Sequence, residues 1–262
     1  MADSERHSFD KSIVILTAGG PLAEVVVNAV AKRFDKVSVI QEDAETIVEM
    51  ARRWCRLHGV RTALGRLAFG PLQRIAAWRS RHRRREILDG DGLDPAIRED
   101  VERHRVHSVN SDDCRQHLVA LSPCAVLVVG TRMIRRQTLE AVDAPFFNYH
   151  AGLNPMYRGQ YGGYWAAATG NRDQVGVTVH LIDQGVDTGA ILYARTLELT
   201  AHDSMATIHY RQVAAAVPLI LQSLQDAIDC SLKPKTMTGT SRQWFHPTAF
   251  EYVANGLRLG LW

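Results

Sequence analysis

Residues 12–40 read SIVILTAGGPLAEVVVNAVAKRFDKVSVI, and this stretch decides the fold. It opens with a β-branched run that ends in two glycines, continues behind Pro21 with apolar residues at helical spacing, and closes on a second β-branched run. Pro21 suits the first position of a helix, where its missing N–H needs no partner. A strand, a glycine turn, a helix and a second strand form a βαβ unit, which is typical of a parallel sheet covered by helices. We therefore predict an α/β fold, a Rossmann-like parallel or mixed sheet flanked by helices.

The rest of the chain continues this pattern. Short apolar runs predict further strands at 125–130, 146–150, 175–182 and 190–199, the last two as a hairpin. Apolar stripes at helical spacing predict helices over 44–58, 61–88, 111–121, 161–171 and 204–228. We predict one large domain over residues 1–200 and a small C-terminal helical appendage, a helix and a tail, over residues 201–262.

The composition is that of a soluble globular protein. The 262 residues carry a formal net charge of +3, which is too small to require a polyanionic partner. Four cysteines without a CxxC pair predict reduced thiols. The polar start MADSERHSFDKS shows no secretory signal, and the longest apolar run is too short to cross a membrane. We expect a cytoplasmic protein that makes no membrane contact.

Two motifs each allow two interpretations. TAGGPLAE, residues 17–24, either holds an anion at a helix start or forms a tight turn, and it lacks the GxGxxG spacing of a dinucleotide fingerprint. RSRHRRR, residues 79–85, indicates either a nucleic-acid contact or a solvated helix end whose cations suit the helix dipole. Because interleaved aromatic residues are absent and acids return at Glu86, we predict the solvated helix end and no nucleic-acid partner.

Eleven histidines raise the question of a metal site. HxxxH, HExxH and CxxC spacings are all absent from the sequence, so we expect no metal. His117, His180 and His209 lie in periodic segments, and we predict that they are structural or surface groups.

The stretch FNYHAGLNPMYRG, residues 147–159, contains the best candidates for chemistry. Asn148 and His150 are two residues apart in a predicted strand, so they project from one face at the carboxyl end of a parallel sheet, where open α/β folds bind ligands. The amide can donate to a developing oxyanion, and the imidazole can exchange a proton near neutral pH. LIDQGVDTGAI, further along, offers Asp183 and Asp187, and a carboxylate beside His150 would raise its pKa. Asn, His and Asp without a Ser or Cys nucleophile suggest acyl transfer directly to an amine; a purely structural His–Asp pair is the alternative.

The segment from Val126 to Tyr193 resembles the folate-dependent formyltransferases, which include the glycinamide ribonucleotide, methionyl-tRNA and sugar N-formyltransferases. FNYHAGLNPMYRG and GVTVHLIDQGVDTGAIL are similar to the family's NxHxSLLPxYRG and DxG segments in order and spacing. The resemblance implies 10-formyltetrahydrofolate as co-substrate. Asn148 and protonated His150 would stabilise the oxyanion, while Asp187 would orient His150 and assist removal of the amine proton. The implied folate-binding residues are Thr131, Arg132, Met133, Ile134, Ile182, Asp183, Gln184 and Gly185.

The resemblance implies the formyl donor more firmly than the amine that accepts the formyl group. Gly152 and Asn154 depart from the family's Ser and Leu beside the trio. The chain after Leu199 is too short for the basic barrel of methionyl-tRNA formyltransferases, and TAGGPL matches the phosphate loop of the glycinamide ribonucleotide enzymes poorly. The outline is most similar to that of the sugar N-formyltransferases, so we expect a nucleotide-linked amino sugar. The residues expected to contact it are Gly152, Tyr157, Arg158 and Gly159.

Three alternatives stay open. They are a formyltransferase for another small amine or a hydroxylamine, a formyltetrahydrofolate hydrolase, and a non-catalytic Rossmann-like binding module. A homodimer is compatible with the sequence.

Overall fold

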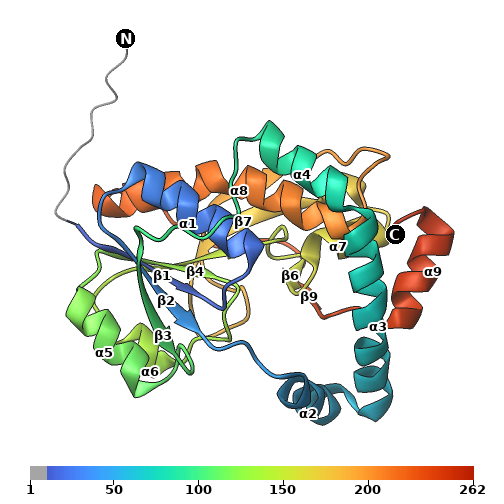
Figure 1. Cartoon of the computed structure of the whole chain (residues 1–262), viewed down its shortest axis with the longest axis horizontal. Coiled ribbons are helices and arrows are strands. Elements are labelled where there is room, and N and C mark those ends of the chain that lie inside the picture. The colour runs from blue at the N-terminus through green and yellow to red at the C-terminus, as the bar shows by residue number, and fades with distance from the viewer. Residues whose placement is uncertain (1–10) are drawn as a thin grey trace.

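The predicted βαβ unit lies at the centre of a seven-stranded sheet in the computed structural model, which describes residues 11–262 (Figure 1). The strand order is β3-β2-β1-β4-β5-β7-β8. The strands are β1 (Ile13–Thr17), β2 (Val37–Glu42), β3 (Glu102–Val106), β4 (Ala125–Val129), β5 (Phe146–His150), β7 (Gly176–Leu181) and β8 (Ile191–Thr196). β1 to β5 are parallel, whereas β7 is antiparallel to both of its neighbours, β5 and β8. The predicted α/β fold with a mixed sheet is confirmed.

Helices lie on both faces of this sheet and to one side of it. They are α1 (Pro21–Arg33), α2 (Ile47–His58), α3 (Val60–Arg79), α4 (Arg81–Gly90), α5 (Asp112–Leu121), α6 (Arg136–Leu139), α7 (Gly162–Ala168), α8 (Met205–Ile228) and α9 (Ala249–Leu259). A separate two-stranded sheet pairs β6 (Arg158–Gly159) with β9 (Gln243–Trp244). In Figure 1, α1 and α8 lie above the main sheet, α5 and α6 lie below it, and α2, α3 and α9 stand to one side.

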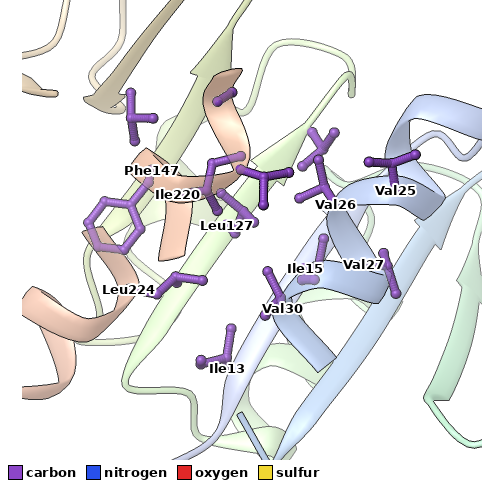
Figure 2. Close-up of a cluster of buried hydrophobic side chains, with 14 of the residues drawn as sticks. Ile13, Ile15, Val25, Val26, Val27, Val30, Leu127, Phe147, Ile220 and Leu224 are labelled. Carbon is purple, nitrogen blue, oxygen red and sulfur yellow. The ribbon is translucent and has the colours of Figure 1, made fainter. Parts of the chain in front are cut away.

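The central strands are buried on both faces, which explains their continuous apolar runs. Ile13 and Ile15 of β1 point toward α1 and α8, where they meet Val30 and Leu224 (Figure 2). Val14, between them, joins the opposite cluster with Leu118 of α5. Burying an aliphatic side chain of this size contributes roughly 1.5–3 kcal/mol, so the strand–helix interfaces dominate the stability of the sheet.

The glycine turn after β1 starts α1 as the sequence predicted. Gly19 and Gly20 have φ of 81° and 98°, a left-handed conformation that residues with a Cβ rarely adopt. The N–H of Gly19 donates to Thr17 Oγ1 at 2.9 Å, and Pro21 follows as the first helical residue. The glycines therefore form a tight βα turn between Thr17 and Pro21, and residues 21–24 are the first turn of α1.

The helix predicted over 61–88 breaks in two at Ser80, where α3 ends and α4 begins. The arginine run therefore spans the end of α3, where Arg79 lies, and the start of α4, and the prediction of a solvated helix end is wrong for Arg83 and Arg84. Arg83 lies 4.0 Å from the buried carboxylate of Asp203, and Arg84 donates to the Tyr210 hydroxyl at 3.2 Å. Arg84 docks α4 onto α8, and Arg83 docks it onto the turn that precedes α8.

The C-terminal part contributes to the main core as well as to an appendage. Val213 and Ile220 of α8 pack in the same cluster as β1 and β4, so a division after residue 200 separates α8 from a core that it shares. α9 packs against α3 at the side of the molecule. Among the helices of residues 11–262, none has the length and apolar character that crossing a bilayer requires.

Candidate active site

Asn148 and His150 lie at the carboxyl end of β5, on the face of the sheet that also carries Phe146. Alternate residues of a strand share a face, so the two side chains point to one spot. His150 is 5% exposed, and Asn148 is partly buried. In the antiparallel pairing of β5 with β7, His180 lies opposite Asn148. The sheet itself therefore positions three hydrogen-bonding side chains together.

The carboxylate of Asp187 lies between these side chains. Its Oδ1 accepts a hydrogen bond from Asn148 Nδ2 at 3.0 Å and lies 3.4 Å from His180 Nε2. Its Oδ2 accepts from the N–H of Gly159 at 2.8 Å and lies 3.4 Å from His150 Nδ1. Asp187 follows β7 in a loop and has φ of 51°, a conformation that non-glycine residues adopt rarely and that recurs at functional sites. The loop thus closes the predicted trio into one network.

The charges of this network are set by burial and by its neighbours. Burial raises the pKa of Asp187, but His150, His180 and the N–H of Gly159 outweigh burial and bring the pKa to about 2. Asp187 is therefore ionised at neutral pH. For His150 burial is the strongest influence, and it lowers the pKa although Asp187 and the carbonyl of Tyr157 raise it. Asp187 raises the pKa of His150, as expected, but the loss of solvent around the imidazolium outweighs the carboxylate, so the net shift is downward.

Both ring nitrogens of His150 face oxygen atoms. Nε2 lies 2.7 Å from the carbonyl oxygen of Tyr157, which can only accept, so Nε2 carries a proton. Nδ1 faces Asp187 and is free to gain or lose a proton there. A Cβ at Gly152 would lie 2.4 Å from the Tyr157 oxygen and 2.6 Å from His150 Nε2, which is closer than atoms can pack. A residue with a side chain at this position would therefore displace the His150 ring.

His180 belongs to the same network. The prediction of a structural or surface group did not include its contact with Asn148 and Asp187. The side chain is 2% exposed, and Nδ1 donates to the carbonyl of Leu181 at 2.8 Å. Nε2 is then free to accept from Asn148 Nδ2 at 3.2 Å. The amide of Asn148 is thus held by Asp187 on one side and by His180 on the other. An antiparallel partner for β5, read from the alternation in VTVHL, would have revealed this position.

A cavity of about 540 Å³ opens beside the network. Asn148, His150 and Asp187 line it. The predicted folate-binding residues that line it are Thr131, Arg132, Met133, Ile134, Ile182, Asp183 and Gly185, whereas Gln184 does not. Within residues 11–262, no group of three or more His, Cys, Asp or Glu side chains is placed to hold a metal ion.

The loop after β4 is fixed against this cavity by a buried acid. Glu42, at the end of β2, accepts from the N–H of Arg132 at 2.6 Å and from its Nη1 at 3.1 Å. Asn110 donates to the carbonyl of Met133 at 3.0 Å and accepts from the N–H of Arg135 at 2.7 Å. The loop therefore presents a defined backbone edge to a ligand.

Three of the four residues expected to contact the acceptor are placed elsewhere. Gly152, Tyr157 and Arg158 do not line the cavity, whereas Gly159 does. Tyr157 is 1% exposed and supports His150 through its carbonyl. Arg158 donates to the carbonyl of Val186 at 2.6 Å and to Ser241 Oγ at 2.8 Å. These three residues, which were expected to contact the acceptor, therefore position His150 and the loop that carries Asp187.

The sequence is similar to that of a known protein family. A model of the formyl transferase family matches residues 84–224. The methionyl-tRNA formyltransferase of Albidiferax ferrireducens is 36% identical over 121 residues, which are 46% of this chain and 37% of that protein. The chain thus aligns with less than half of the length of that curated relative.

Solved structures share the fold at low sequence identity. A sugar N-formyltransferase from a Shewanella species superposes with a TM-score of 0.57 and 16% identity, covering 90% of this chain and 77% of that one. An N-formyltransferase from Helicobacter canadensis, in complex with folinic acid and dTDP-3-aminofucose, gives a TM-score of 0.56 and 15% identity, covering 90% of this chain and 71% of that one.

Proposed function

The chain belongs to the formyl transferase family, and from that premise we propose that it transfers the formyl group of 10-formyltetrahydrofolate to a primary amine. The observation that carries the proposal is the ionised Asp187 carboxylate, shared by Asn148, His150 and His180 at the edge of a ligand-sized cavity. This network has a hydrogen-bond donor, a proton carrier and a fixed negative charge, but no nucleophile of its own. It suits a reaction in which the acceptor amine is the nucleophile.

In this mechanism the amine nitrogen attacks the formyl carbon, the new C–N bond forms, and the carbonyl electron pair moves to oxygen. Asn148 donates to that oxygen after exchanging its longer hydrogen bond, 3.2 Å to His180. His150 Nδ1 receives the amine proton, the Asp187 carboxylate stabilises the imidazolium that results, and the bond to N10 of the folate then breaks. The proton ends on N10, so tetrahydrofolate and the formamide are the products.

The folate is expected to lie between the loop after β4 and the loop that carries Asp187. Both loops line the cavity, and both offer backbone N–H and C=O groups to a pterin ring. The Helicobacter protein, which shares the fold, was solved with folinic acid, and this supports a folate as the co-substrate.

We propose a nucleotide-linked amino sugar as the acceptor. The proposal rests on the fold likeness to sugar N-formyltransferases and on the dTDP-3-aminofucose in the Helicobacter complex. Methionyl-tRNA is the second candidate, because the sequence is 36% identical to a methionyl-tRNA formyltransferase over 121 residues. A cytoplasmic location and a homodimer stay predictions.

An acceptor screen tests the proposal. Purified protein is given 10-formyltetrahydrofolate with a panel of dTDP- and UDP-linked amino sugars or with methionyl-tRNA, and release of tetrahydrofolate is followed. Release that depends on one amino sugar supports the proposal, and release only with methionyl-tRNA replaces the acceptor. Release at one rate with and without an amine identifies a hydrolase instead.

A further inference from the structure

The cavity has a second wall, built by elements outside the residues that match the family model. We use the name second wall for Trp54 and His58 of α2, Arg66 of α3, and Phe245 after β9, all of which line the cavity. Residues 84–224 carry the family match, so all four residues lie outside it. The family model therefore covers the catalytic network but not this wall.

Arg66 is the most deeply buried arginine of residues 11–262, with 6% of its surface exposed. Its Nε donates to the carbonyl of His246 at 2.9 Å, and its guanidinium lies 5.7 Å from the ring centres of both Trp54 and Phe245. No carboxylate within residues 11–262 forms an ion pair with it, although it lines the cavity. Buried cations are normally paired, so this guanidinium lacks an anion.

Arg103 and Arg132, two other partly buried arginines, each have a carboxylate partner. Arg103 lies 2.6 Å from the carboxylate of Glu24, and Arg132 lies 3.1 Å from that of Glu42. Burial lowers the pKa of Arg66, the charge of Glu251 raises it, and the charge of Arg53 lowers it again. The missing partner of Arg66 is therefore expected to come from a ligand in the cavity.

The surroundings of Arg66 narrow the chemistry of that ligand. Arg53, whose own carboxylate partner is Glu45 at 2.7 Å, also lines the cavity and adds positive charge. Trp54 and Phe245 flank the guanidinium, and the His58 ring lies 4.6 Å from that of Phe245. A forked cation between aromatic rings fits a phosphate group attached to a planar base.

We propose that Arg66 binds the phosphate of the acceptor, a nucleoside diphosphate carrying the amino sugar, and that the second wall holds its nucleotide part. This inference rests on the proposed function. The folate is the substrate common to the family, and its loops lie inside the matched residues, whereas the second wall lies outside them. With the folate bound between the loops inside the matched residues, the second wall faces the part of the cavity that remains for the acceptor.

The test measures binding without catalysis. UDP, dTDP, uridine, thymidine and folinic acid are titrated calorimetrically into the wild type, Arg66→Gln, Arg66→Lys and the control Arg61→Gln. Arg61 starts the same helix but is exposed and lies outside the cavity lining. We expect one diphosphate to bind the wild type more tightly than its nucleoside, and Arg66→Gln to weaken it at least about tenfold, since hydrogen bonds to charged groups are the stronger ones. Arg66→Lys should recover part of this loss.

Folinic acid distinguishes the source of the anion and also reports folding. Unchanged folinic acid affinity in Arg66→Gln, together with weaker diphosphate binding, supports the proposal. Weaker folinic acid and unchanged diphosphate binding would assign Arg66 to the glutamate carboxylate of the folate and overturn it. Equal binding of UDP, dTDP and their nucleosides by the wild type would overturn it without any variant, while intact folinic acid binding would leave the proposed folate chemistry standing.

Discussion

The two walls of the cavity differ in how their side chains are held. The first carries Asn148, His150 and Asp187 on hydrogen-bonded strands and on a loop tied down by Gly159. The second stands on α2 and α3, where neighbours such as Leu57 and Leu64 are 65% and 60% exposed. A strand register fixes atoms to the precision that bond making needs, whereas surface helices tolerate exchange of side chains. The difference is consistent with the proposal that the first wall carries out the formyl chemistry and the second wall binds the acceptor.

The largest expected effect comes from Asp187→Asn. The amide cannot stabilise a protonated His150, so kcat should fall by about 10²–10⁴-fold, the range for loss of acid–base catalysis. Stopped-flow release of tetrahydrofolate measures the rate, and thermal unfolding checks the fold. Asp173→Asn is the matched control, because Asp173 is exposed and outside the network. A rate within a few-fold of the wild type would remove Asp187 from the mechanism.

Arg66→Gln should weaken acceptor binding without affecting folate binding. With the proposed acceptor, KM for the acceptor should rise by about tenfold or more while KM for the folate stays constant. Steady-state kinetics with each substrate varied in turn measure both constants. An equal loss in both would mean that the two walls do not act separately.

His180 is expected to be a positioning residue with a smaller effect. His180→Ala removes a partner of Asn148 and of Asp187, so kcat should drop about tenfold, equivalent to ~1.4 kcal/mol. His180 lowers the pKa of His150, so its removal should move the His150 limb of the pH–rate profile to higher pH. His180→Gln, which can again accept from Asn148, should recover part of the rate. An unshifted profile would reduce His180 to a packing role.

Acid should weaken the fold through histidines near the first wall. Burial is the main reason that the pKa of His209 falls to about 4, with the Gln212 hydrogen bond raising it and His150 lowering it. An unfolded histidine titrates near 6.5, so the unfolded chain takes up protons first, and stability is complete above that pH and lost as pH falls toward 4. Urea unfolding at about pH 7.5 and about pH 5 should show a loss of ~2 kcal/mol that is smaller in His209→Gln. Equal losses in both proteins would contradict the assignment.

The smallest effect is expected far from both walls. Arg83→Gln should lower the free energy of unfolding by roughly 1 kcal/mol, because Arg83 lies near the buried carboxylate of Asp203, which Arg211 also neutralises. Arg85→Gln, at an exposed position, should change it by less than about 0.5 kcal/mol. Neither change should alter formyl transfer, and a large loss of kcat/KM in either would show that α4 contacts a substrate.

The sequence predicted those features that depend on local periodicity. The βαβ start, the buried strand 125–130 and the shared face of Asn148 and His150 follow from spacings of two and of about 3.6 residues, which are visible in one chain. The contact of His180 with Asn148 was not predicted, because it depends on an antiparallel pairing between distant strands. Arg66 was not predicted as a site residue for the same reason, since its cavity forms only when α3 meets the segment after β9. The break at Ser80 was not predicted either, because the apolar spacing continues across it while α3 and α4 are separate helices.

The most direct test follows an isotopically labelled formyl group from 10-formyltetrahydrofolate in the presence of the amino sugar selected by the screen. We predict that mass spectrometry finds the label on the sugar nitrogen, in amounts that match tetrahydrofolate release, and that His150→Ala abolishes both. Label recovered as free formate at a rate independent of the amine, or transfer that survives in His150→Ala, would contradict this prediction.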